Sequence, residues 1–272
     1  MLSIADIFLF GGLGIVTGTL AGLFGLGGGT LIVPGLFYLF SFMDLPQESL
    51  MHLAAGTSMA IMIFTSAAST WAHQSKGNIK WEILKKMIFV IVIGAVIGRL
   101  FSHNLPTELL EVIFGVFLVL VSIKIFIGFK PQTNENFTPG IAITNFMGFL
   151  IGLKSGVLGV GGGSLSVPFL LYCGLPMKQA SGTSASFTLP IAIMGTLAVL
   201  FLGNDHTVIP GAISYIYLPA VVMVAPFTMI GAPIGAHLTQ VIPAQKLRRF
   251  FALCLFLASL KMLPGAGQLF VH

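Results

Sequence analysis

Charged side chains are scarce in this chain. Lys, Arg, Asp and Glu make up 8% of its 272 residues, whereas ordinary soluble domains carry about 25% charged residues. Hydrophobic residues make up 56%, and the mean hydropathy is +1.00. A soluble protein with so little charge could not cover its surface with polar groups. The composition therefore excludes an ordinary soluble domain and predicts an all-α polytopic membrane protein.

Acidic residues are fewest among the charged ones. All eight lie near the ends of apolar runs or in connections, so no carboxylate stands ready as a proton relay or sodium site inside the membrane. Whether a proton or sodium couples to any transport stays open. The net charge of +5 comes from scattered basic residues in connections, which indicates topology determinants and not nucleic-acid binding.

Cysteine is also rare. Cys173 and Cys254 lie far apart within apolar runs, and we expect them to be small buried hydrophobes. No group of His, Cys, Asp and Glu residues has the spacing of a metal site. We therefore expect no metal, no cofactor and no enzymatic activity, because a catalytic cluster is missing.

Long apolar runs fill most of the chain. A spanning helix needs roughly 20 residues, so the second and seventh runs, at about 31–42 and 165–174, are too short to cross alone. The ten runs cover about 5–24, 31–42, 50–72, 84–102, 107–129, 139–157, 165–174, 179–203, 211–237 and 246–263.

The two halves repeat the same motifs in the same order. The segment Gly22–Pro34 reads GLFGLGGGTLIVP, and Gly156–Pro168 reads GVLGVGGGSLSVP. Further matched pairs are Leu45-Pro46 with Leu175-Pro176, Gly56-Thr57-Ser58 with Gly182-Thr183-Ser184, Gly94–Gly98 with Gly231–Gly235, and Pro106 with Pro243. The matched motifs thus predict a tandem duplication. We expect a first transmembrane repeat at 1–129, a cytoplasmic linker at 130–138 and a second repeat at 139–272.

Basic residues predict the orientation. Lys76, Lys80, Lys85 and Lys86 flank the connection between the third and fourth runs, which the positive-inside rule places in the cytoplasm. The later cluster at 246–249 also lies inside if each half crosses five times. It lies outside if each half crosses four times, with the short run re-entrant. The rule therefore favours two inverted five-segment repeats, with both termini outside.

The glycine runs predict breaks in two helices. Each glycine costs roughly 1 kcal/mol of helix propensity relative to alanine. Because proline suits the first turn of a helix, we expect unwound stretches over 26–33 and 159–167, with short helices restarting at Pro34 and Pro168. The alternative is that the glycines only let helices approach closely. Freed N–H groups and helix N-termini favour anions, so the predicted binding residues here are Gly27, Gly28, Gly29, Thr30, Gly161, Gly162, Gly163 and Ser164.

The repeated Gly-Thr-Ser triplets add hydroxyl groups early in the third run of each half. Thr57, Ser58, Thr183 and Ser184 could line a cavity and donate to an oxyanion. Alternatively, Ser and Thr in membrane helices bond back to carbonyls of their own helix. We predict a binding role for these four residues because both triplets lie near the glycine breaks.

Two basic residues fall within apolar runs. Lys154 precedes the second glycine run, and its counterpart in the first half is Leu20. A lysine at membrane depth is costly, so Lys154 is a candidate cation for an anionic substrate; the alternative is that it reaches the outer interface. Arg99 lies near the expected outer end of the fourth run, where we interpret it as an interfacial anchor; the alternative is that it attracts anions to the mouth.

In these motifs the chain resembles the TauE/SafE sulfite exporter family, also called the toluenesulfonate uptake permease group. The resemblance covers essentially the whole chain. The residues that carry it are Gly25–Pro34, Gly159–Pro168, Gly56-Thr57-Ser58, His73 with Gly77-Asn78-Ile79, Gly182-Thr183-Ser184 and Gly231–Gly235. It implies a plasma-membrane carrier for small anions, often sulfur oxyanions or organosulfonates and sometimes carboxylates. It fixes neither the substrate nor the direction.

The resulting hypothesis is a secondary transporter in the plasma membrane of a bacterium. It would move sulfite, another sulfur oxyanion, an organosulfonate or a carboxylate by alternating access. Its expected partners are that small anion and the lipid bilayer, with no nucleic acid; whether it forms a homo-oligomer stays open. A passive anion channel and a non-transporting membrane assembly subunit are the alternatives.

Overall fold

The computed structural model describes residues 4–24, 28–43, 45–127, 140–202, 209–241 and 244–263. Over these ranges the chain forms ten α-helices, one 3-10 helix and one small hairpin, which confirms the all-α prediction with ten helical segments. In order, the elements are α1 (Ile4–Phe24), α2 (Gly29–Ser41), η1 (Gln47–Ser49), α3 (Leu50–Gln74), α4 (Trp81–His103), α5 (Thr107–Ile127), α6 (Ile141–Leu158), α7 (Gly163–Tyr172), α8 (Met177–Leu202), β1 (Ala212–Ile213), β2 (Ile216–Tyr217), α9 (Leu218–Val241) and α10 (Ala244–Met262). The expected linker at 130–138 lies outside the described residues.

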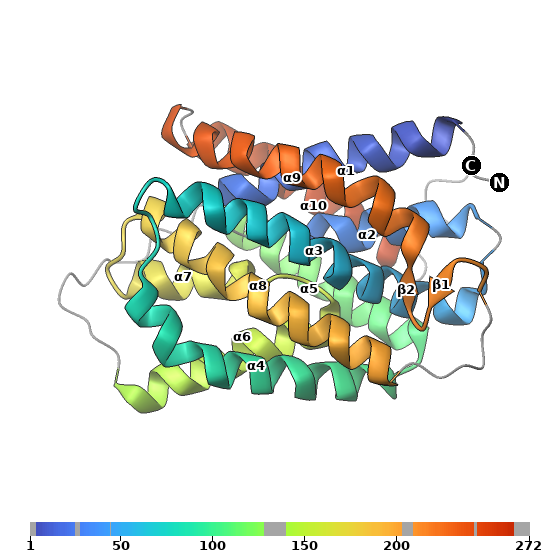
Figure 1. Ribbon diagram of the computed structural model, residues 1–272, viewed down its shortest axis with the longest axis horizontal. Coiled ribbons are helices and arrows are strands. Elements are labelled where there is room, and N and C mark those ends of the chain that lie inside the picture. The colour runs from blue at the N-terminus through green and yellow to red at the C-terminus, as the bar shows by residue number, and fades with distance from the viewer. Residues whose placement is uncertain are drawn as a thin grey trace.

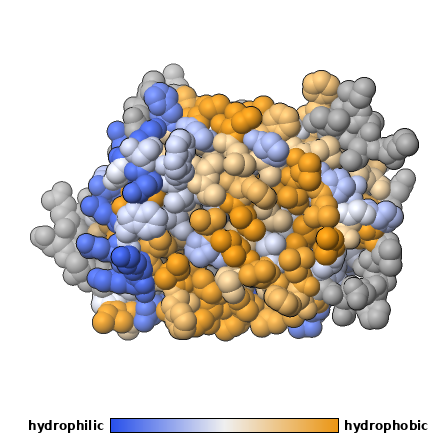
Figure 2. All heavy atoms as spheres, in the orientation of Figure 1, coloured by the Kyte–Doolittle hydropathy of each residue, from blue (hydrophilic) through white to orange (hydrophobic). Residues whose placement is uncertain are grey.

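The molecule has the surface of a membrane protein. Five helical segments are long and apolar enough to cross a bilayer, namely Gln47–Gln74, Thr107–Ile127, Ile141–Leu158, Met177–Leu202 and Leu218–Leu238. Figure 2 shows apolar side chains over the middle of the visible face and hydrophilic ones gathered at one end. Exposed residues such as Phe89, Leu120 and Val222 fit a lipid-facing surface. The chain is therefore a multi-pass membrane protein.

The two short helices fall where the sequence predicts them. α2 has 13 residues and α7 has 10. At 1.5 Å per residue these helices are about 20 Å and 15 Å long, well short of a hydrocarbon core of about 30 Å. Each short helix forms one arm of a broken element, α1 with α2 and α6 with α7.

The helices pack in pairs that repeat between the halves. α1 packs against α9 as α6 packs against α4, and α2 packs against α3 as α7 packs against α8. α3 and α8 pack against each other, as do α5 and α10. In Figure 1, α3 and α8 cross the middle of the view, with α1 and α9 along one side and α4 and α6 along the other.

Glycines bring the helices of these pairs into close contact. A Cβ on Gly22 would lie 1.9 Å from the carbonyl oxygen of Ala232, and one on Gly156 would lie 2.1 Å from that of Ala95. Only glycine fits such an approach of two backbones. At these positions the small-residue alternative of the sequence analysis holds, and it does so at matched places in both halves.

Contacts along the helices also give their directions. α1 and α9 run the same way, because Gly14 abuts Val224 and Gly22 abuts Ala232. α3 runs parallel to α9, since Thr65 Oγ1 donates to Thr228 Oγ1 at 2.7 Å and Lys76 Nζ donates to the carbonyl of Ala236 at 3.1 Å.

By contrast, α3 and α8 run in opposite directions. Gly195 of α8 abuts Met59 in α3, while Gly182, nearer the start of α8, abuts Asn78 beyond the end of α3. The directions agree with two inverted repeats. The inverted repeat itself stays a prediction.

Candidate functional site

The first glycine run interrupts the element formed by α1 and α2. α1 ends at Phe24, Gly28 has a positive φ of 78°, and the backbone N–H groups of Leu31 and Ile32 donate to the Gly28 carbonyl. The predicted break is present, but the predicted restart at Pro34 is wrong: α2 begins at Gly29. Gly28 makes the turn that opens the new helix, and Pro34 is tolerated inside it. Gly27 lies outside the described residues.

The second run interrupts the element formed by α6 and α7 in the same way. Gly159 adopts a left-handed conformation with φ of 67°, and the N–H groups of Gly159 and Val160 donate to the Ser155 carbonyl, closing the end of α6. α7 then begins at Gly163, not at Pro168. The unwound stretch is therefore shorter than predicted, because glycine at the turn lets the helix restart at once.

The two breaks touch each other inside the bundle. A Cβ on Gly29 would lie 2.8 Å from Cα of Val160 and 3.1 Å from the carbonyl oxygen of Gly159. α3 lies against the same place, since a Cβ on Gly159 would lie 2.6 Å from Cα of Ala55. Gly28, Gly29 and Gly159 are all buried. We call this meeting point of residues 28–30 and 159–164 the junction.

Both short helices direct their N-termini at the junction from opposite sides. α2 is antiparallel to α3, because Gly28 contacts Thr65 while Gly29 contacts Met62. α7 is antiparallel to α8, because Gly162 contacts Ile191 while Ser166 bonds Ser184. Since α3 and α8 oppose each other, so do α2 and α7. The first turn of each helix has N–H groups without an intrahelical partner, and these attract negative charge.

Lys154 of α6 adds a positive charge at the junction. Its Nζ donates to the carbonyl oxygen of Gly161 at 2.8 Å and to Oγ of Ser164 at 2.7 Å. The ammonium also lies 5.2 Å from the ring centroid of Phe117. The side chain is therefore held on the second break and not extended to the outer interface. An ammonium has three N–H donors, so these two bonds leave one for a ligand.

The Gly-Thr pairs of the two triplets hold connecting segments of the chain against α3 and α8. Thr57 Oγ1 accepts the N–H of Tyr217 at 2.9 Å, and Thr183 Oγ1 accepts the N–H of Lys80 at 3.0 Å. Gly56 and Gly182 let the same connections approach, at the carbonyls of Tyr215 and Asn78. The structure thus gives Thr57 and Thr183 a matched docking role, and their part in binding stays a prediction.

The third residues of the triplets differ. Ser184 Oγ lies 2.6 Å from Oγ of Ser166, which follows the second glycine run and was not singled out from the sequence. Ser58 is buried, and its Oγ has no hydrogen-bond partner in the part of the chain that the structure describes. Ser186 and Thr188 bond back to carbonyls of α8. The hydroxyl of Ser58, which lies one turn after Ala55 on α3, is therefore available to a ligand.

Arg99 is not the interfacial anchor that the sequence suggests. Its side chain is only 1% exposed, and His103, one helical turn further along α4, has its ring centroid 6.2 Å from that of Tyr215 in the hairpin. From the sequence alone, an arginine near the end of an apolar run is interpreted as interfacial, because the sequence does not show which side chains bury it. His73 also gains a partner: its Nε2 donates to the carbonyl of Gly22 at 3.0 Å, near the first break.

Within the described ranges, no group of three His, Cys, Asp or Glu residues could hold a metal ion. The junction presents backbone N–H groups, hydroxyls and the amine of Lys154, beside the carbonyls of Gly159 and Gly161. Donors of this kind suit an anion.

Comparison with known proteins identifies the class first. The chain is 35% identical over 252 residues to a probable membrane transporter protein of Haemophilus influenzae, covering 92% of this chain and 95% of that protein. It is 30% identical to the probable membrane transporter protein YunE of Bacillus subtilis, covering 84% and 86%, and 27% identical to the one named MJ0441 of Methanocaldococcus jannaschii, covering 92% of each. The chain is thus a membrane transporter.

The family follows from the sequence model that matches the chain. The model described as sulfite exporter TauE/SafE covers residues 10–262. The chain belongs to the TauE/SafE family, as the motifs predict. No solved structure matches it.

Proposed function

We propose that this transporter carries a small anion across the plasma membrane and binds it at the junction. The substrate class is a sulfur oxyanion such as sulfite, an organosulfonate or a small carboxylate. The observation that supports this most is the contact of Gly29 with Gly159 and Val160, which brings the N-terminus of α2 against the stretch that leads into α7. Lys154 supplies a positive charge at the same place.

The electrostatics of the junction favour an anion over a cation. The N-termini of α2 and α7 each carry about half a positive charge, which the C-terminal ends of α1 and α6 at the same breaks partly offset, and Lys154 adds one more when it is protonated. In the described ranges, no carboxylate is among the residues that form the junction. Gly28, Gly29 and Gly159 are buried, so these donors act at a lower dielectric than at a surface and bind charge more strongly.

Alternating access is the proposed mechanism. The paired contacts divide the molecule into two similar sets of helices, α1 with α9 and α6 with α4, around α3 and α8. If these sets rock against each other about the junction, the anion is exposed first to one side and then to the other. The junction belongs to both sets, so each can form half of the site.

Transport in proteoliposomes tests the proposal. Purified protein should accumulate at least one of sulfite, thiosulfate, methanesulfonate, acetate or lactate. Unlabelled anion on the far side should accelerate uptake of the labelled one, because a carrier exchanges its substrate. Flux without this acceleration would favour a passive channel. No flux of any of these anions would reject the proposal.

A further inference from the structure

Arg99 carries a buried charge that the junction does not use. Its side chain is 1% exposed, and neither Nη1 nor Nη2 has a hydrogen-bond partner among the residues that the structure describes. Removing a guanidinium from water without replacing its hydrogen bonds carries a large desolvation penalty. A folded protein keeps such a group where a counter-charge binds it.

Three aromatic or imidazole rings form a cluster at this end of α4. His103 lies one helical turn after Arg99, its ring centroid lies 6.2 Å from that of Tyr215, and the ring centroid of His52 lies 5.1 Å from that of Tyr215. Nε2 of His52 donates to the carbonyl of Leu105, and its buried Nδ1 has no partner in the described part of the chain. The cluster therefore holds unpaired polar atoms on two residues.

The cluster lies close to the junction, on the side of the hairpin. The backbone N of Arg99 lies 2.9 Å from where a Cβ on Gly156 would stand, and Gly156 is one turn before the break at Gly159. On α3, His52 is one turn before Ala55, which touches Gly159. One helical turn is about 5 Å. The backbone of Arg99 thus lies about one helical turn from the second break.

The opposite end of the bundle has a cation at the matched position. Gly98 pairs with Gly235 in the repeat, so Arg99 pairs with Ala236, whose carbonyl accepts Nζ of Lys76 at 3.1 Å. Gly22 abuts Ala236 as Gly156 abuts Arg99. Each end therefore has a cation beside an equivalent contact between two helices, that of α6 with α4 at one end and that of α1 with α9 at the other. Lys76 has a carbonyl partner there, whereas the two terminal nitrogens of Arg99 have none within the described part of the chain.

We propose that Arg99, His52, Tyr215 and His103 form a second anion-binding site. This second site is distinct from the junction and binds one small oxyanion. A planar guanidinium binds two oxygens of such an anion at once. Because Arg99 is enclosed by helices, the occupant is a free solute and not a lipid headgroup. Its use as a loading site for the substrate rests on the proposed function; its ability to bind an anion does not.

Thermal unfolding of the purified protein tests this site. Sulfite, thiosulfate, methanesulfonate and acetate are titrated against the wild type, Arg99→Gln, Arg99→Lys and the control Lys124→Gln, which removes an exposed charge on α5. We expect Arg99→Gln to raise the melting temperature without anion, because an unpaired buried charge is gone. It should also raise the half-saturating anion concentration at least tenfold, with Arg99→Lys intermediate and Lys124→Gln unchanged.

The outcomes separate this inference from the proposed function. If Arg99→Gln lowers the melting temperature and leaves the anion response unchanged, Arg99 is structural and the second site is rejected, even if flux persists. If the anion response depends on Arg99 but no anion is transported, the site stands and the proposed function fails. Phosphatidylglycerol is the comparison ligand: a response to it alone that requires Arg99 would also overturn the assignment to a free solute.

Discussion

At the scale of single residues, the junction depends on side chains that bind backbone atoms. Lys154 bridges Gly161 and Ser164 across the second break, and Leu20, its counterpart in the first half, is buried and apolar. The junction is therefore asymmetric although the helices repeat. One half supplies the fixed charge, while both halves supply N–H groups.

The first prediction concerns that charge. Lys154→Gln should raise the half-saturating anion concentration about 10- to 100-fold, because a hydrogen bond to a charged group contributes roughly 1.5–3 kcal/mol. Lys154→Arg keeps the charge and should retain part of the affinity. Uptake by proteoliposomes measures both. Unchanged affinity in Lys154→Gln would show that the ammonium only braces the break.

The second prediction separates docking from binding in the Gly-Thr-Ser triplets. Thr183→Val leaves the part-buried N–H of Lys80 without its acceptor, which costs at most about 1–3 kcal/mol of stability. The melting temperature should fall, and the half-saturating anion concentration should stay the same. The control is Thr144→Val, whose hydroxyl bonds a carbonyl near the exposed start of α6. A weakened anion response at unchanged stability would instead support the binding role predicted from the sequence.

At the scale of elements, the breaks decide where the short helices begin. The sequence predicts both breaks correctly, since three adjacent glycines weaken a helix. It places the restart at the prolines because proline favours the first turn. The structure restarts each helix at Gly29 and Gly163, where the chain has already turned. The conformation of the preceding glycines, and not the preference of proline for the first turn, therefore sets where each short helix begins.

The third prediction tests the turn at Gly159. Gly159→Ala should be strongly destabilising, because its φ is 67° and the new Cβ would lie 2.6 Å from Cα of Ala55. Gly77→Ala is the matched control: its φ is 65°, but no atom lies within 4 Å of the new Cβ. The control should lose only the cost of the left-handed conformation, about 1–2 kcal/mol. Melting temperatures in detergent compare the two, and equal losses would mean that the junction is loosely packed.

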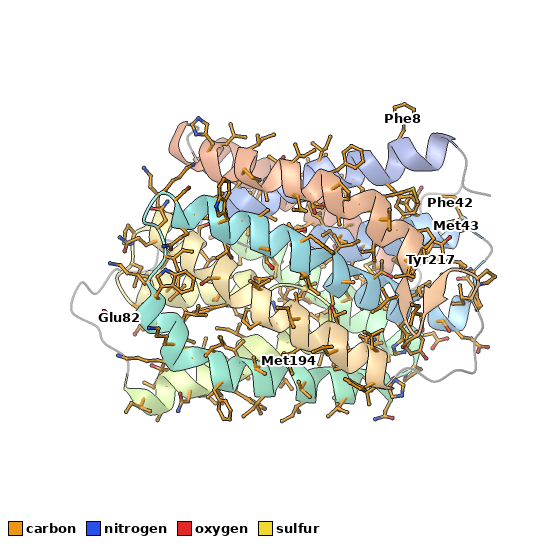
Figure 3. The ribbon with its side chains drawn as sticks, viewed as in Figure 1. Phe8, Phe42, Met43, Glu82, Met194 and Tyr217 are labelled. Atoms are coloured by element: carbon orange, nitrogen blue, oxygen red, sulfur yellow. The ribbon has the colours of Figure 1, made fainter. Side chains whose placement is uncertain are left out.

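At the scale of the whole molecule, the ends of the bundle differ in charge. Glu82, in the first turn of α4, lies at the opposite end from Phe42 and Tyr217 (Figure 3). Lys80 and Lys85 belong to the same end as Glu82, which is the hydrophilic end in Figure 2. The positive-inside rule would place this end in the cytoplasm and the hairpin outside.

The fourth prediction tests that orientation. In a variant in which Cys173 and Cys254 are replaced by serine, Lys85→Cys should react with a membrane-impermeant maleimide only from the cytoplasmic side. Ile213→Cys in the hairpin, which is 55% exposed, should react only from outside. Labelling of intact cells and of inverted vesicles measures the two. Reaction of both positions from one side would reject the five-crossing topology.

The sequence by itself determined what local chemistry controls. Too little charge required a membrane, the lengths of the apolar runs set the helices, and repeated glycines set the two breaks. Only the tertiary structure decided that the breaks touch, that Lys154 lies on one of them and that Arg99 is buried with its two terminal nitrogens unpaired among the described residues. These facts depend on which helix faces meet, and such meetings join residues far apart in the chain, where neither propensity nor periodicity acts.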